Sequence, residues 1–465
     1  MEVRVSSLGA IKEATVQLKP LTVFIGPNNS GKTWLAYTLA TALDSYGWDR
    51  YLDSCDIEKL SESYPTLVEF IQEVIEQGNG KLDIIRFAEQ NGPKYFEEIF
   101  CLARRWLPKA FGTKKASFEN LEIRIDLADS KARFLENIKE AALERRLSLN
   151  KRTQEALINI VKEKNDSEIY IYAEANAFEK FPLEGIKKFI FRIVFGVLHR
   201  ALYPNVYVLP TERTNIITAS FSKRVTRTNT RKSANRDLEE LENHIVPHPI
   251  ANLVHLMLVK VRDTSLEERT ESAKKIPSIA KYLQLAKDLE EKILAGEIEV
   301  SNPDNITDTN FSFQQQGINL EMTVASSMVK ELAPLVLYLR YAAEIGDLLI
   351  IDEPEMNLHP LAQVRLTELL AMLVNFGIPV LITTHSPYIV DHLVNLMKAY
   401  ESQNQAEIAP KFFLKQKEAF ISKEKLSIQL FENGTARNIL KEDGLIDWGT
   451  FGDVSEQINN IYFEI

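Results

Sequence analysis

The sequence has little cysteine, no excess of positive charge and no long apolar run. Its 465 residues include two cysteines, Cys55 and Cys101, which cannot build a disulfide framework and offer no Cys-x-x-Cys spacing for zinc or redox chemistry. Lysine and arginine number 55 against 65 aspartates and glutamates, a formal net charge of −10. This balance argues against a protein whose whole surface binds nucleic acid or an anionic bilayer, but it allows a local basic patch.

Segments that would direct the chain into a membrane are also missing. The first ten residues lack the basic stretch and apolar run of a secretory signal. Apolar stretches such as 332–343 are too short and carry a charge, so no membrane span is predicted. With 45% apolar and 26% charged residues, the chain can bury a sizeable core. We therefore expect a soluble, cytoplasmic protein.

The pattern of apolar residues predicts an α/β fold. β-type runs open the sequence as a meander, and a helix is expected over 33–43. In the last third, the continuous apolar strands 347–352 and 378–384 alternate with helices, which is typical of a parallel sheet covered on both faces. The opening strands are predicted at 3–8, 14–18 and 21–25, and further edge strands at about 409–431.

The middle of the chain is predicted to be mainly helical. Charged amphipathic helices dominate from about 50 to 200, and the clearest is expected over 131–164. Further helices are predicted at about 237–262 and 276–295. Strands are predicted at 121–125, 168–173, 205–210, 297–300, 309–315 and 318–324.

Residues 26–33, with the sequence GPNNSGKT, match the phosphate-binding pattern G-x-x-x-x-G-K-S/T between a strand and a helix. In such a loop, backbone N–H groups at a helix N-terminus point at a polyphosphate. The glycines allow close approach, and Asn29 tolerates left-handed geometry. Lys32 is expected to reach the β- and γ-phosphates, and the Thr33 hydroxyl to ligate Mg²⁺. The predicted nucleotide-binding residues are Gly26, Asn28, Asn29, Ser30, Gly31, Lys32, Thr33 and Trp34.

Asp352 and Glu353 stand at the end of an apolar strand. Side chains at the C-terminal end of a parallel strand emerge beside the crevice where open α/β sheets bind ligands. Asp352 is predicted to hold Mg²⁺, and Glu353 to orient and deprotonate the attacking water. Such a pair alone is usually a strand end that meets solvent, but the upstream phosphate loop favours the catalytic interpretation.

The next apolar strand ends in Thr383, Thr384 and His385. A histidine at this position can donate a hydrogen bond to the γ-phosphate and so report its presence. A lone histidine near a strand end is more often structural. Its position after the phosphate loop and the carboxylate pair favours a catalytic role for His385.

In this order, GPNNSGKT, LLIIDEPEMNLHP and LITTHS resemble the motifs of ABC-type ATPases of the SMC, RecF and OLD-like group. They look most like those of stand-alone ATPases in bacterial anti-phage systems, such as the Septu and PARIS ATPase subunits. The resemblance covers roughly residues 1–45 and 315–400. It implies a split P-loop ATPase head with a large helical insertion, the cofactors ATP and Mg²⁺, and two heads that sandwich ATP in a homodimer or larger oligomer.

By the same resemblance, ASSMVKEL (325–332) occupies the place of the signature segment, which would contact the nucleotide of a second head. Ser326 or Ser327 is expected to cap the helix, and Ser327 is the predicted contact in trans. The usual LSGGQ glycines are missing, so an ordinary capped helix is the alternative. Residues 357–359 occupy the place of the loop that couples one site to the other.

These observations divide the chain into an ATPase head and its insertions. The VLPTERT segment (208–214) has no role that the sequence assigns. The predicted segments are the N-terminal part of the head (1–48), a mainly helical insertion with some strands (49–204), a strand with a basic loop and helical arm (205–300), and the C-terminal part of the head (301–465).

A basic stretch at 222–236 contains six cations and no acid. It could contact phosphates of DNA or RNA, but its Ser, Thr and Asn content and lack of aromatics fit a solvated loop equally well. Its cations are Lys223, Arg224, Arg227, Arg231, Lys232 and Arg236.

Two functions remain open. In the first, the chain is an ATP-driven switch or sensor in an anti-phage or toxin–antitoxin-like complex, and a partner chain carries the effector, a nuclease or toxin. In the second, it is a DNA-repair or recombination ATPase that acts directly on DNA. A nuclease on the same chain is disfavoured, because the Asp-x-Asp pair of Toprim-type nucleases does not occur in the 80 residues after His385.

Overall fold

The computed structural model describes residues 1–148, 158–174, 177–218, 246–301, 310–441 and 443–448. The chain forms two compact units. The first unit comprises Met1–Ser6 and Thr38–Val206, and the second comprises Ser7–Tyr37 and Tyr207–Ile465. The second unit therefore joins a segment near the start of the chain to the last part of it, as a split head requires.

A mixed sheet lies at the centre of the second unit, with the strand order β16-β15-β3-β14-β13-β9. β15, β3, β14 and β13 run parallel, and β16 runs antiparallel to β15. Every residue of β3, β13 and β14 is buried, as expected where both faces of a parallel sheet are covered. The predicted α/β fold class is confirmed. The strands are β3 (Leu21–Ile25), β9 (Val206–Leu209), β13 (Leu348–Asp352), β14 (Val380–Thr384), β15 (Leu426–Glu432) and β16 (Thr435–Asn438).

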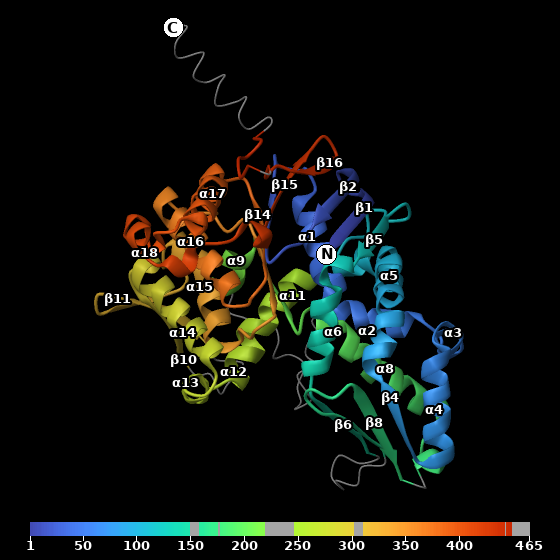
Figure 1. The fold of residues 1–465 in the computed structure, drawn as a ribbon. Coiled ribbons are helices and arrows are strands. Elements are labelled where there is room, and N and C mark those ends of the chain that lie inside the picture. The colour runs from blue at the N-terminus through green and yellow to red at the C-terminus, as the bar shows by residue number, and fades with distance from the viewer. Residues whose placement is uncertain (149–157, 175–176, 219–245, 302–309, 442, 449–465) are drawn as a thin grey trace, which may run out of the picture. The chain divides into compact units, whose positions relative to one another are not determined.

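Long helices of the second unit pack against one another beside this sheet (Figure 1). α16 contacts both β14 and α17, and α14 contacts both α15 and α16. Proline stands in the first turn of α14, α16 and α17, where its fixed φ suits a helix start. These helices are α14 (Pro277–Leu289), α15 (Ser327–Tyr341), α16 (Pro360–Asn375) and α17 (Pro387–Glu401).

The second unit also contains an antiparallel sheet with the order β10-β11-β12, which confirms the strands predicted there. Its strands are β10 (Glu297–Ser301), β11 (Asn310–Gln315) and β12 (Ile318–Glu321). The first part of the predicted helix 237–262 lies outside the described residues. Several helical segments precede this sheet in the chain. They are α9 (Arg213–Thr218), α11 (His248–His255), α12 (Val261–Asp263), α13 (Leu266–Ala273) and the π-helical turns Leu256–Lys260 and Glu290–Leu294.

The first unit combines an antiparallel sheet of order β4-β8-β7-β6 with amphipathic helices. β1 (Glu2–Leu8) pairs antiparallel with β5 (Glu122–Asp126) through Glu2–Ser6. In the described part of the chain, no helix is long and apolar enough to cross a membrane. The other elements are α2 (Ser45–Ser54), α3 (Ile57–Ser63), α4 (Pro65–Gln77), β4 (Asn79–Asp83), α5 (Ile84–Ala110), α6 (Lys131–Glu140), β6 (Leu143–Leu147), β7 (Ile158–Lys162), β8 (Glu168–Ala173), α7 (Ala177–Lys180) and α8 (Leu183–Leu202).

The single helix predicted over 131–164 is wrong. The helix α6 ends at Glu140, because Ala141 adopts an extended backbone. β6 and β7 follow as an antiparallel pair. In β7, residues alternate between buried and partly exposed positions, which is the period of a strand. The charged residues of this stretch concealed that alternation and favoured a helical interpretation.

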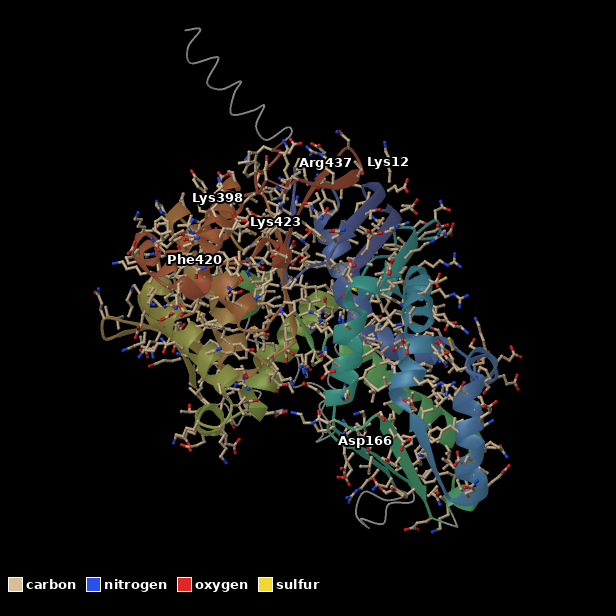
Figure 2. The ribbon with its side chains drawn as sticks, viewed as in Figure 1. Lys12, Asp166, Lys398, Phe420, Lys423 and Arg437 are labelled. Carbon is tan, nitrogen blue, oxygen red and sulfur yellow. The ribbon has the colours of Figure 1, made fainter. Side chains whose placement is uncertain are left out.

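Two strand predictions also need correction. β3 does not continue a meander from β1 and β2 (Ile11–Gln17), because it pairs in parallel with β14 and β15. Residues 409–425 form short helical turns, a stretch marked by Phe420 and Lys423 in Figure 2. β15 then enters the interior of the sheet, and it is β16 that forms the edge.

Candidate active site

The phosphate loop connects β3 to the helix α1 (Lys32–Leu43). Asn29 has φ 60° and Gly31 φ 99°, so the left-handed conformations expected from these residue types are present. A Cβ atom at Gly31 would lie 2.5 Å from Cγ1 of Ile11, and one at Gly26 would lie 2.2 Å from the carbonyl oxygen of Phe431. Both glycines are therefore required by close packing around the loop.

The Lys32 side chain is buried and folds back over the loop. Its Nζ donates to the carbonyl oxygens of Gly26 at 2.8 Å and Pro27 at 2.9 Å. Burial lowers the pKa of Lys32 to about 8, and the nearby carboxylates of Glu353, Asp352 and Glu355 partly offset that effect. The ammonium group is thus held inside the loop that is predicted to receive a polyphosphate.

The Asp352 carboxylate is buried at the end of β13 and accepts several hydroxyl hydrogen bonds. The Thr33 hydroxyl donates to its Oδ1 at 2.9 Å, and the Tyr37 hydroxyl donates to its Oδ2 at 2.9 Å. The Thr383 hydroxyl also donates to Oδ1. Burial raises the pKa of Asp352, while these hydrogen bonds act in the opposite direction. Residues 319 positions apart in sequence therefore share one polar centre.

Glu353 and His385 form a pair beside this centre. Nε2 of His385 lies 3.0 Å from Oε1 of Glu353, and about a quarter of each side chain is exposed (28% and 27%). The hydrogen bond from His385 is the main cause that lowers the pKa of Glu353. Glu353 has φ 48°, and its backbone N–H donates to the carbonyl and hydroxyl oxygens of Thr383, each at 3.1 Å.

A family model of an AAA ATPase domain matches residues 1–390 of this chain. That range includes the phosphate loop, the carboxylate pair and His385. The chain belongs to the AAA ATPase family. It is therefore an enzyme that binds and hydrolyses ATP, and the predicted ATPase activity is confirmed.

Solved structures similar to this ATPase are distant. An SMC head bound to the C-terminal winged-helix domain of ScpA matches 94% of this chain and 96% of its own, with 9% identity and a TM-score of 0.36. The SMC head domain from Thermotoga maritima matches 94% and 97%, with 9% identity and a TM-score of 0.30. An Smc head with an extended coiled coil, bound to the C-terminal domain of ScpA derived from Pyrococcus furiosus, matches 98% of both chains, with 10% identity and a TM-score of 0.34. No curated protein matches the chain.

In this ATPase, the sequence interpretation missed the carboxylate of Glu355. Its Oε1 accepts a hydrogen bond from the Thr384 hydroxyl at 2.7 Å and one from the backbone N–H of His385 at 2.6 Å. Glu355 therefore fixes the turn that carries His385. The available signal was a second acid two residues after Glu353 in the same loop.

The sequence interpretation also missed Arg213, in the 208–214 segment of the ATPase. Its side chain is 1% exposed and donates to the backbone carbonyls of both Asp352 and Glu353. The available signal was an arginine four residues after the end of the buried strand β9, because a buried charge usually requires several partners.

The other predicted residues lie at two places, the start of α15 and the start of α1. Ser326 caps α15 by accepting the Val329 N–H at 3.3 Å, and the exposed Ser327 is its first residue. Among the described residues, Ser327 has no hydrogen bond to the phosphate loop of its own chain. The indole ring of Trp34 packs against Gly9, where a Cβ atom would lie 3.1 Å from Cδ2.

Two remaining features concern loops. Asn357 has φ 57°, and His359 caps α16 by accepting the Leu361 N–H at 3.3 Å. The basic stretch from Lys223 to Arg236, predicted as a possible nucleic-acid contact, lies outside the described residues.

Proposed function

We propose that this ATPase is an ABC-type nucleotide switch of a cytoplasmic anti-phage or toxin–antitoxin-like complex, with the effector on a partner chain. The observation that carries the proposal is the 2.9 Å hydrogen bond between Thr33 and Asp352. It brings the phosphate loop and the carboxylate strand into one centre, beside the Glu353–His385 pair. The order of motifs and the resemblance to anti-phage ATPases support the biological role.

The Thr33 hydroxyl and the Asp352 carboxylate fit a magnesium ion. Both are oxygen donors, and Mg²⁺ is usually held by one or two carboxylates together with substrate phosphates. Burial raises the pKa of Asp352, and a bound cation would act in the opposite direction by favouring the ionised carboxylate. When bound, Mg²⁺ would neutralise negative charge on the β- and γ-phosphates.

The chain's own residues supply positioning and proton transfer. Lys32 exchanges its contacts with the Gly26 and Pro27 carbonyls for phosphate oxygens. Glu353 is ionised near neutral pH, because its pKa is lowered, and it takes the proton of the attacking water. His385 holds this carboxylate until nucleotide binds and then donates to the γ-phosphate.

The proposed switch uses two copies of the chain. The exposed Ser327 stands at the N-terminus of α15, where free N–H groups and the helix dipole favour an anion. A second head would present its ATP there, and residues 357–359 would couple the two sites. Nucleotide state then controls the homodimer or larger homo-oligomer, and through it the effector chain.

A second candidate is a DNA-repair or recombination ATPase. The six cations of 222–236 favour it, because a cluster of that kind can contact successive phosphates. In that case the nucleotide switch would act on DNA without an effector chain.

Turnover measured with and without nucleic acid separates the two candidates. The purified chain is assayed for ATP hydrolysis alone, with duplex DNA and with RNA at moderate salt, and affinity-purified from its own cells with ATP. The switch predicts unchanged turnover and copurification of the product of a neighbouring gene. A several-fold stimulation by DNA, lost when the six cations of 222–236 are replaced by glutamine, would favour the repair ATPase instead.

A further inference from the structure

Arg213 is the first residue of α9 and lies deep in the second unit. Its side chain is 1% exposed. The guanidinium donates from Nη1 to the carbonyl oxygens of Pro210 at 2.8 Å and Asp352 at 2.6 Å, and from Nη2 to that of Glu353 at 2.8 Å. Arg213 therefore holds the backbone of Asp352 and Glu353 through their carbonyl oxygens.

The same guanidinium also contacts α15. Nε donates to the carbonyl oxygen of Glu331 at 3.3 Å, and Nη2 forms an ion pair with the buried Glu331 carboxylate. α9 and α15 pack against each other around this pair. Thr214 supports it, because its hydroxyl donates to the other oxygen of Glu331 at 2.5 Å. One side chain thus links α15 to the end of β13.

The conformation of Glu353 shows why such a brace matters. A φ of 48° places Glu353 in the left-handed region, which is unfavourable for a residue that carries a Cβ atom. The conformation is fixed from both sides, since Thr383 accepts from the Glu353 N–H and Arg213 donates to the Glu353 carbonyl. The direction in which the Glu353 side chain leaves the backbone depends on these two peptide contacts.

We propose that Arg213 is a positioning residue for ATP hydrolysis. Its hydrogen bonds to the Asp352 and Glu353 carbonyls keep Glu353 in the left-handed conformation that directs its carboxylate to the attacking water. The ion pair with Glu331 neutralises the buried guanidinium and so contributes to stability, while the carbonyl contacts set its position. This proposal rests on the general-base role of Glu353 given above.

The alternative is that Arg213 and Glu331 are only a buried ion pair of the core. Such a pair can often be replaced by uncharged residues without loss of stability, whereas removal of one partner is strongly destabilising. The two roles therefore predict different results for a variant in which both Arg213 and Glu331 are replaced by uncharged residues. A core ion pair predicts unchanged turnover, and a positioning role predicts a lower kcat. Lysine cannot replace arginine in the positioning role, because a single ammonium group lacks the planar fork that reaches several carbonyls at once.

The test compares Glu331→Gln with Arg213→Met/Glu331→Gln in the full chain. For each, kcat, KM, ATP affinity and the melting temperature are measured. Glu331→Gln should melt at a lower temperature but keep kcat within about threefold, because the carbonyl contacts remain. The double variant should lose at least about tenfold in kcat, with KM and ATP affinity within about twofold, since misplacement of a catalytic group lowers turnover. Thr214→Val serves as a control that touches Glu331 alone and should keep kcat.

Arg213→Lys keeps the charge and covers the case in which the double variant does not fold. It should lower kcat several-fold at unchanged KM. The proposal is overturned if the double variant, or Arg213→Lys in its place, keeps wild-type kcat, or if kcat and ATP affinity fall in parallel. Glu353→Gln is assayed alongside. Full turnover in that variant would reject the general base itself, whereas an inactive Glu353→Gln with an active double variant would reject only the role of Arg213.

Discussion

The two units bury different kinds of side chain. In the first unit, aromatic rings surround Phe195, which stacks on Tyr95 at a centroid distance of 4.8 Å. In the second unit, charged groups such as Lys32, Asp352 and Arg213 are buried around one centre. The first arrangement gains stability from apolar packing, while the second would fix charges around the proposed phosphate site. Substitutions in the aromatic cluster of the first unit should therefore change stability, and those of Lys32 and Glu353 in the second unit should change ATP binding or turnover.

Lys32→Ala should have the largest effect and abolish detectable ATP binding, because the charge-assisted contact to the phosphates is lost. Isothermal titration with ATP measures this. Lys162→Met is the matched control, since Lys162 is also buried and donates to backbone carbonyls, those of Lys139 at 3.0 Å and Ala141 at 2.8 Å. It should lower the melting temperature and leave ATP affinity unchanged. If Lys32→Ala bound ATP as tightly as the wild type, the assignment of residues 26–33 as the ATP-binding loop would be rejected.

Glu353→Gln should lower kcat by about 10³-fold, since general bases contribute roughly 10²–10⁴-fold. It should also trap ATP and stabilise the dimer or larger assembly, which single-turnover kinetics and light scattering measure. The control is Glu98→Gln in the first unit, where the carboxylate accepts hydrogen bonds from Tyr51 at 2.6 Å and Tyr64 at 2.9 Å. Glu98→Gln should keep normal turnover. A monomeric Glu353→Gln with ATP bound would contradict the two-headed sandwich.

Phe195→Ala should reduce the free energy of unfolding by about 3–5 kcal/mol, because it leaves a cavity among packed aromatic rings. Urea denaturation measures this loss. Activity per folded molecule should not change. Tyr172→Ala is the control, since this side chain in β8 is 54% exposed and its loss should have little effect. If Phe195→Ala instead changed KM for ATP, the contrast between the two units would fail.

A pH dependence tests the first unit in another way. Nε2 of the buried His199 lies 3.1 Å from the Leu43 carbonyl oxygen, and burial lowers the pKa of this histidine to about 4. In the unfolded chain this histidine binds a proton near pH 6.5. Above that pH, neutral His199 therefore makes its full contribution to the free energy of unfolding. It is lost as the pH falls toward 4, by about 3 kcal/mol in total. Unfolding curves between pH 7 and pH 4 should show this loss, and His199→Gln should flatten it. Parallel slopes for the two proteins would contradict the assignment.

The sequence allowed a large part of the second unit to be predicted. The types of residue in the phosphate loop required its backbone geometry, and two continuous apolar strands implied a parallel sheet. The end of each strand then indicated Asp352 and His385. The loop geometry and the parallel sheet were predicted correctly because each rests on local chemistry, a glycine spacing or an apolar run, while the roles of Asp352 and His385 stay predictions.

Features that depend on distant contacts could not be predicted. Arg213 acquires its position only when β9 and β13 lie in one sheet and α15 packs beside α9. The hairpin of β6 and β7 was hidden, because its charged residues satisfy a helical pattern as well as a strand pattern. In both cases the tertiary structure decides among alternatives that the sequence leaves equal.

The folded-back Lys32 has a consequence for affinity. Because its ammonium group already donates to the Gly26 and Pro27 carbonyls, a triphosphate bound as proposed would have to displace these two hydrogen bonds. The free energy of ATP binding would then reflect the difference between the phosphate contacts that form and the carbonyl contacts that are lost. A modest affinity would therefore be compatible with strong contacts between Lys32 and the phosphates. Release of ADP would also be easier, because the carbonyl contacts of Lys32 can form again.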